Sequence, residues 1–125
     1  MSISGNGCES SSRAVVAGGM YDNYGYSNTM EYITPANTGN TTDFGDLIQP
    51  SQVQGADTTS SGAYWVTGCT NGTRGDWCGG TMKVSGYPGR LSIDVIQYIT
   101  IASTGNATDA GNLTDEIHFA QSGQG

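Results

Sequence analysis

The sequence has few charged residues, one histidine and no long apolar run, and each scarcity excludes a class of function. Among 125 residues only four are basic and eleven are acidic, which gives a net charge of −7. A negative field repels a phosphate backbone, so nucleic acid is not expected as a partner. No stretch has the length of a membrane span. Residues 1–6 lack a charged n-region and an apolar h-region, so no signal peptide is expected.

The inventory of reactive side chains is also small. Catalysis needs a nucleophile, a base or paired carboxylates held by neighbours. The one histidine, His118, is expected to be a strand residue beside Phe119, and no acidic pair or glycine-rich phosphate loop recurs. Three cysteines and one histidine offer no ligand set with metal-site spacing. We therefore expect no enzyme, no metal and no cofactor.

The abundant residues favour strands. The chain has 20 glycines, many Ser, Thr and Asn, and seven Tyr, two Trp and two Phe spread among β-branched residues. Aromatic and β-branched residues fit strands, whereas Gly, Asn and Ser make turns. No helical periodicity of useful length occurs. The composition predicts an all-β fold of short strands and tight turns.

An internal repeat divides the chain into unit 1 (residues 1–61) and unit 2 (residues 62–125), which together make one domain. At an offset of 61 residues, Gly7-Cys8, Arg13 and Gly18-Gly19 match Gly68-Cys69, Arg74 and Gly79-Gly80. At an offset of 66 residues, residues 31–34 and 38–47 match residues 97–100 and 104–113. The difference is a five-residue insertion within residues 81–90.

The sequence predicts a series of strands in each unit. In unit 2 the Asn71-Gly72 pair predicts a type I′ hairpin turn. Counted outward from that turn, Cys69 faces Arg74 and Cys78 faces Trp65, so these thiols are not partners and all three cysteines are expected to be free and buried. The expected strands are Arg13–Met20, Thr29–Pro35, Thr42–Ile48, Ala63–Thr67, Arg74–Met82, Asp94–Ala102, Thr108–Leu113 and Glu116–Gln121.

The amino-acid sequence of the repeat resembles that of a known family. "RAVVAGG" and "RGDWCGG", followed by "MEYITPANTGNTTDFGDL" and "IQYITIASTGNATDAGNL", resemble the kelch type of β-propeller blade. They are closer still to a kelch-like repeat of marine and cyanobacterial phage structural proteins. The resemblance covers nearly the whole chain and implies two propeller-type blades in a virion protein. The chain departs from the family in length, because the family usually carries many such repeats.

Two blades cannot close a ring, since propellers use about four to eight. We therefore expect oligomerisation to close the ring, with a homotrimer favoured over a dimer. The resemblance implies a capsid decoration, a knob or a tail-fibre component, located in the virion with other virion proteins as partners. The alternative is a free oligomeric lectin-like propeller that binds a cell-surface glycan.

A tyrosine-rich loop is the candidate ligand-binding or surface-binding site. Tyr21, Tyr24 and Tyr26 lie between the expected strands Arg13–Met20 and Thr29–Pro35, and Tyr87 lies in the insertion of unit 2. Tyr, Ser, Asn and Gly make adaptable contact surfaces. The tyrosine rings could equally cover the end of a sheet.

Two Asp-x-Gly segments recur at equivalent positions, Asp43 with Gly45 and Asp109 with Gly111. They resemble the Asp-box hairpin of some propellers, in which the aspartate caps its own turn. We expect structural turns here, with a cation site at Asp43, Asp46 and Asp109 as the alternative. The tripeptide Arg74-Gly75-Asp76 is expected to be a coincidence within a strand.

Overall fold

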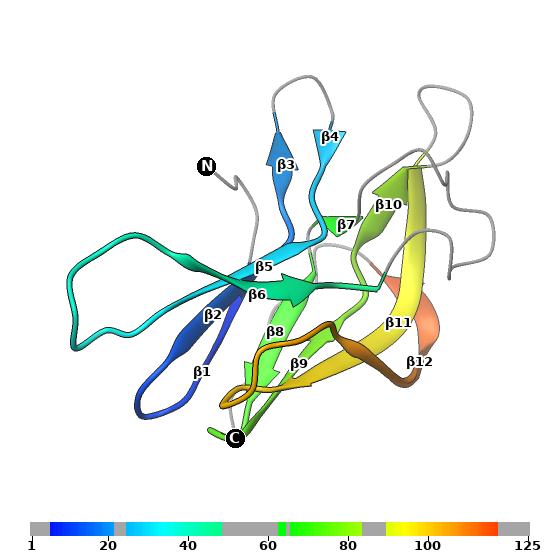
Figure 1. Cartoon of the computed structure of the whole chain (residues 1–125). Helices are drawn as coiled ribbons and strands as arrows, with labels where there is room; N and C mark the ends of the chain where they lie inside the picture. The colour runs from blue at the N-terminus through cyan, green and yellow to red at the C-terminus, as the bar shows by residue number, and fades with distance from the viewer. Residues whose placement is uncertain (1–5, 22–24, 49–62, 65, 84–89, 118–125) are drawn as a thin grey trace.

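The computed structural model describes residues 6–21, 25–48, 63–64, 66–83 and 90–117, and it is all-β (Figure 1). These residues form twelve strands in antiparallel sheets, and none of them lies in a helix. The prediction of an all-β fold is confirmed. Within the described part of the chain no helix could cross a membrane.

Unit 1 forms a four-stranded antiparallel sheet with the order β1-β2-β5-β6. A separate two-stranded hairpin, β3 with β4, is inserted between β2 and β5 and stands away from the sheet in Figure 1. The strands are β1 (Asn6–Glu9), β2 (Ala14–Ala17), β3 (Met20–Tyr21), β4 (Gly25–Tyr26), β5 (Thr29–Ile33) and β6 (Thr42–Asp46).

Unit 2 repeats this order with β8, β9, β11 and β12. The long strand β11 pairs with β10 at its start, with β12 from Ile93 to Tyr98 and with β9 from Ile96 to Thr100, and β7 adds to β10. The strands are β7 (Ala63–Tyr64), β8 (Thr67–Thr70), β9 (Arg74–Cys78), β10 (Thr81–Lys83), β11 (Arg90–Thr100) and β12 (Thr108–Ile117).

Equivalent turns of the two units share their hydrogen bonds. The Ser10 amide donates to the Arg13 carbonyl at 2.8 Å, and the Asn71 amide donates to the Arg74 carbonyl at 3.2 Å. The Ser10 hydroxyl and the Asn71 side-chain oxygen then accept the amide of the arginine at 3.1 and 2.8 Å. The repeat in the sequence is therefore also a repeat of backbone structure.

The hairpin predicted at Asn71-Gly72 has a different register. Gly72 and Thr73 form its centre, Asn71 flanks them, and Cys69 faces Asp76 while Cys78 faces Thr67. The Asn71 side-chain oxygen accepts the Thr73 amide at 2.9 Å in addition to the arginine amide, which holds Asn71 outside the turn centre. The predicted pairs of Cys69 with Arg74 and Cys78 with Trp65 were wrong.

The strands predicted over Arg13–Met20 and Arg74–Met82 are each broken in two. The φ angles are 68° and 126° at Gly18-Gly19, and 63° and 106° at Gly79-Gly80. Such angles suit glycine and lie outside the β region, so the chain leaves the sheet between β2 and β3 and between β9 and β10.

The end of the described chain also differs from the prediction. Thr108–Leu113 and the start of Glu116–Gln121 form one strand, β12, in which Ile117 pairs with Ile93 of β11. Residues 118–121 lie outside the described residues. Glu116 and Ile117 therefore belong to the sheet of their own unit.

The core lies between the two sheets. We define the front face of unit 1 by Cys8, Val15, Ala17, Met30 and Tyr32, and its back face by Ala14, Val16, Glu31 and Ile33. The repeat places Cys69, Asp76, Cys78, Ile96 and Tyr98 on the front face of unit 2, and Gly75, Trp77, Gln97 and Ile99 on its back face.

The front face of unit 1 packs on the back face of unit 2. Val15 and Met30 are 0% exposed on the first, and Trp77 is 0% and Ile99 3% exposed on the second. A single apolar cluster includes residues of both faces. The two units are therefore stacked head to tail, front against back.

Candidate interaction surfaces

The tyrosine-rich segment forms the β3–β4 hairpin. Met20 pairs with Tyr26, and Tyr21 pairs with Gly25, so the two tyrosines lie on opposite strands of this hairpin. Tyr24 and Tyr87, the other two residues of the predicted binding surface, lie outside the described residues. The surface proposed from these tyrosines stays a prediction.

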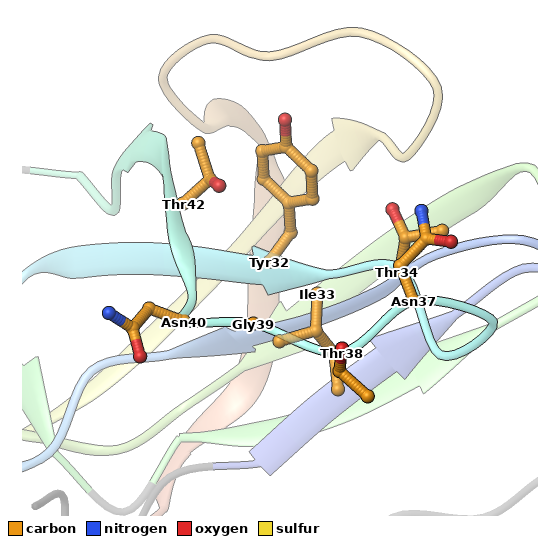
Figure 2. Close-up of a pocket in the computed structure, with 8 residues that line it drawn as sticks. All are labelled: Tyr32, Ile33, Thr34, Asn37, Thr38, Gly39, Asn40 and Thr42. Carbon is orange, nitrogen blue, oxygen red and sulfur yellow. The ribbon is translucent and has the colours of Figure 1, made fainter.

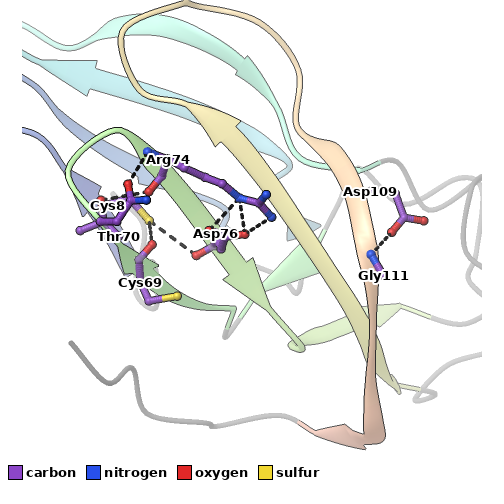
Figure 3. A network of polar contacts seen from close by, with 8 residues as sticks. Cys8, Cys69, Thr70, Arg74, Asp76, Asp109 and Gly111 are labelled. Carbon is purple, nitrogen blue, oxygen red and sulfur yellow. Dashed lines mark hydrogen bonds and ion pairs between the residues drawn. The ribbon is translucent and has the colours of Figure 1, made fainter. Parts of the chain in front are cut away.

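The first contact between the units is made by β1 on β8 and β9. The Cys8 thiol donates to the Cys69 carbonyl at 3.1 Å and to the Asp76 carbonyl at 3.6 Å (Figure 3). The Thr70 hydroxyl donates to the Glu9 carbonyl at 2.9 Å. A Cβ built on Gly75 would lie 2.7 Å from the Cys8 Cβ, so a residue without a side chain is required there.

The second contact joins β6 to the loop before β12. The Gly105 amide donates to the Phe44 carbonyl at 2.7 Å, and the Ala107 amide donates to the Asp46 carbonyl at 2.8 Å. The Asp46 amide donates in return to the Asn106 side-chain oxygen at 3.1 Å. Strand β6 is thus hydrogen-bonded along both edges, by β5 on one side and by residues 105–107 on the other.

Each unit stacks its arginine on a tyrosine. The Arg13 guanidinium lies 4.2 Å from the centre of the Tyr32 ring, and that of Arg74 lies 4.0 Å from the centre of the Tyr98 ring. Arg13 also reaches across the units and donates to the Ile101 carbonyl at 2.8 Å. Arg74 instead pairs with Asp76 at 2.6 Å on the exposed front face of unit 2.

Among the described residues, two faces of the stack are accessible to solvent. On the back face of unit 1, Val16 is 48% and Ile33 is 42% exposed. On the front face of unit 2, Cys69, Asp76, Cys78, Ile96 and Tyr98 are half-buried. Apart from the half-buried Tyr32, the residues that define the equivalent faces inside the stack are buried, so the difference comes from the neighbouring unit.

The Asp-x-Gly segments lie within strands, not in turns. Gly45 and Asp43 pair with adjacent residues of β5, and Gly111 and Asp109 pair with adjacent residues of β11. One residue in each segment is therefore extra, which makes a β-bulge at the same place in both units. The Asp109 carboxylate accepts the Gly111 amide at 2.8 Å, an Asx-type contact inside this bulge.

The described residues offer no group of three or more His, Cys, Asp or Glu side chains that could hold a metal ion. Asp43 and Asp109 are exposed and Asp46 is half-buried. Asp46 uses its backbone amide and carbonyl in the contact with residues 106 and 107. The cation site considered for these residues has no assembled ligand set in this part of the chain.

All three cysteines are described and all three are free, as predicted. The prediction that all three are buried was wrong: Cys8 is buried, whereas Cys69 and Cys78 are half-buried because they lie on the open front face of unit 2. Burial raises the pKa of the Cys8 thiol to about 12, and Cys69 adds to this rise. Burial also raises the pKa of Cys78, with smaller contributions from Cys69 and Asp76.

A shallow depression of about 250 Å³ lies at the β5–β6 connection of unit 1. Figure 2 shows its side chains, which do not converge: Tyr32 and Thr42 project to one side of the connection, whereas Ile33 and Thr38 lie on the other. Hydroxyl, amide and aromatic groups suit a sugar. Their divergence makes the depression a weak candidate for a binding site.

The sequence repeat includes residues that form the contacts between the units, but it does not predict these contacts. Arg13 with Tyr32, and Arg74 with Tyr98, recur at the two offsets of the repeat. The segments Thr38-Gly39-Asn40 and Thr104-Gly105-Asn106 are identical. Such matches identify equivalent positions, but they do not say which copy of each pair has a neighbour.

No protein-family model and no curated protein matches this chain.

Proposed function

We propose that this chain is a structural protein of a phage virion, a capsid decoration, knob or tail-fibre component that acts by assembly and surface binding. One observation carries the assembly: two equivalent units pack head to tail and leave a front face and a back face open. The resemblance of the repeat to phage structural proteins supports the virion. The packing of front on back suits propeller-type blades, which use such stacking all around a ring.

Oligomerisation would close the ring. Three chains of two units supply six blades, which is within the range of about four to eight that propellers use. The homotrimer is therefore favoured, and a ring of two chains is the smaller alternative. Both give cyclic symmetry, a common arrangement of homo-oligomers.

The reactive groups of the described residues support a role without catalysis. The Cys8 thiol is buried and its pKa of about 12 keeps it protonated at neutral pH, so it is a poor nucleophile. Arg74 and Asp76 form an ion pair with each other. These groups serve the packing and the surface of the sheets.

A free glycan-binding lectin is the alternative function. The hydroxyl and amide groups around Tyr32 and Thr42 favour it chemically. A sugar site usually needs several polar groups directed at one ligand. The lectin is the weaker candidate because the side chains in Figure 2 diverge.

The experiment is mass spectrometry of virions purified by density gradient from a culture in which the gene is expressed. We expect the chain to remain with the particles after a high-salt wash, in a constant ratio to the major capsid protein. Recovery only in the soluble fraction would contradict the virion role. A glycan array probed with that soluble fraction would then test the lectin.

A further inference from the structure

We infer that the open front face of unit 2 binds the open back face of unit 1 of a second copy of this chain. The geometry is the one by which the two units of a single chain already pack. This contact rests on the assembly proposed above and identifies the surfaces that perform it. The partner is a second copy because the repeat places positions equivalent to those of the occupied contact on both open faces.

The glycines on both open faces already have backbone angles similar to those at the occupied contact. Within one chain Gly45 lies against Gly105, and a Cβ on Gly45 would be 2.4 Å from the Gly105 carbonyl oxygen. Their equivalents are Gly111 and Gly39, and a Cβ on either would meet nothing within 4 Å. The φ angles agree between equivalents, 143° with 128° and 154° with 151°. The open pair thus has the conformation of the occupied pair.

The hydrogen bonds of β6 can be repeated by β12. Gly105 and Ala107 donate to carbonyls of β6 within the chain. In the second copy Gly39 and Thr41 would donate to the carbonyls of Ala110 and Asn112, two exposed residues of β12. Asn40 would accept the Asn112 amide, as Asn106 accepts the Asp46 amide at 3.1 Å. An edge strand with free amides and carbonyls is a ready surface for such pairing.

Two side-chain contacts repeat as well. The Ile48 amide donates to the Gln97 side-chain oxygen at 2.7 Å. The equivalent Thr114 amide would donate to Glu31 of the second copy, whose carboxylate accepts as the amide oxygen does. Arg74 would reach the Pro35 carbonyl of that copy, as Arg13 reaches Ile101.

Apolar burial would accompany these bonds. Val16 and Ile33 are 48% and 42% exposed on the open back face, whereas their equivalents Trp77 and Ile99 are 0% and 3% exposed inside the stack. Covering them removes apolar area from water, the main driving force of association.

Three differences make this contact weaker than the one within the chain. Asp76 occupies the position of the buried Val15, and Ala14 occupies that of Gly75, where an added Cβ would lie 2.7 Å from the Cys8 Cβ. Each copy also carries a net charge of −7. We therefore expect association that depends on concentration and strengthens with salt, because salt screens the repulsion.

Head-to-tail contacts close into a ring if the rotation between units allows it, and otherwise give a filament. A cross-link between copies measures which occurs. The Ala14→Cys variant places a thiol opposite Cys69 of the next copy, at the position equivalent to Gly75 opposite Cys8. Because Ala14 has a Cβ where Gly75 has none, the two backbones must lie further apart in the proposed contact than in the occupied one. This wider spacing favours the Cβ–Cβ separation of about 3.8 Å that a disulfide needs.

We expect mild oxidation of Ala14→Cys to give covalent oligomers on a non-reducing gel, ending at the trimer for a ring of three or forming a ladder for a filament. The double variant Ala14→Cys with Cys69→Ser should stay uncross-linked. The variant Ala102→Cys, in an exposed loop outside the proposed contact, is the position control. Cross-linking that survives Cys69→Ser, or equals that of Ala102→Cys, would overturn the proposed pairing of faces.

Light scattering supplies the second measurement. A buried charge without a partner is costly, so Ala14→Glu should abolish the oligomer while the matched Ala102→Glu leaves it intact. An oligomer insensitive to Ala14→Glu would show that the copies assemble through other surfaces. This result would refute the pairing of the two open faces but would be compatible with the proposed function. A monomer of 12.9 kDa at every concentration and salt level would refute both the pairing of faces and the proposed function by assembly. Specific cross-linking with no chain in purified virions would keep the contact and refute the virion role.

Discussion

The matched variants Gly45→Ala and Gly111→Ala isolate the contact between the two units. Both glycines occupy the same bulge of equivalent strands, with φ angles of 143° and 128° that suit glycine alone. Both substitutions therefore introduce the same kind of backbone strain. Only at Gly45 does the new methyl also meet another part of the chain, since it would lie 2.4 Å from the Gly105 carbonyl oxygen.

The magnitudes follow from these two effects. A residue forced into an unfavourable φ region costs about 1–3 kcal/mol, and this cost is shared by both variants. The clash at Gly45 further requires residues 105–107 to move away from β6, which breaks the two hydrogen bonds of 2.7 and 2.8 Å. At about 0.5–1.5 kcal/mol each, their loss predicts that Gly45→Ala is destabilised by a further ~1–3 kcal/mol.

Urea unfolding monitored by tryptophan fluorescence, at a concentration where the chain is monomeric, gives the two free energies of unfolding. Equal destabilisation by the two substitutions would refute the contact between β6 and residues 105–107. At higher concentration Gly111→Ala should in turn weaken association, because its methyl would face Gly39 of the next copy.

Three further predictions test single contacts. Burial raises the pKa of the folded Cys8 thiol to about 12, whereas the unfolded thiol keeps its ordinary pKa of about 9.0. The stability that Cys8 contributes is therefore full below pH 9 and is lost between pH 9 and 12, and Cys8→Ala should flatten this pH dependence of the free energy of unfolding in denaturation curves. Arg13→Ala should lower the melting temperature more than Arg74→Ala, because only Arg13 donates to the other unit, and equal shifts would contradict this role. Asp109→Ala should cost about 1 kcal/mol through loss of one local hydrogen bond, and calcium should leave the melting temperature of the unmodified chain unchanged, since a calcium-dependent rise would indicate a cation site.

Much of the secondary structure follows from local sequence. The β-branched and aromatic runs predicted the strands that became β5, β6, β9 and β11, and the repeat matched the strands of the two units in order. The breaks in the strands at Gly18-Gly19 and Gly79-Gly80 were predictable from the sequence, because paired glycines favour a change of backbone direction. Strand β1 was missed since Asn6–Glu9 has little β propensity of its own and depends on its pairing with β2.

The hairpin register was decided by one side chain. The Asn71-Gly72 pair suggested a turn centre, yet the Asn71 side-chain oxygen accepts the amides of Thr73 and Arg74 and moves the centre by one residue. The preference of an Asn-Gly pair is statistical, whereas this hydrogen bonding depends on the geometry of the closed turn. Sequence reasoning therefore placed the hairpin correctly but not its cross-strand pairs.

Local preferences and repetition were enough to predict most of the strands and the equivalence of the two units. The tertiary structure alone decided which face of each unit is covered. Cys8 and Cys69 are equivalent in the sequence, yet Cys8 is buried against unit 2 and Cys69 lies half-buried on an open face. Burial depends on the neighbour that packs against a face, and two identical positions differ when only one of them has a neighbour.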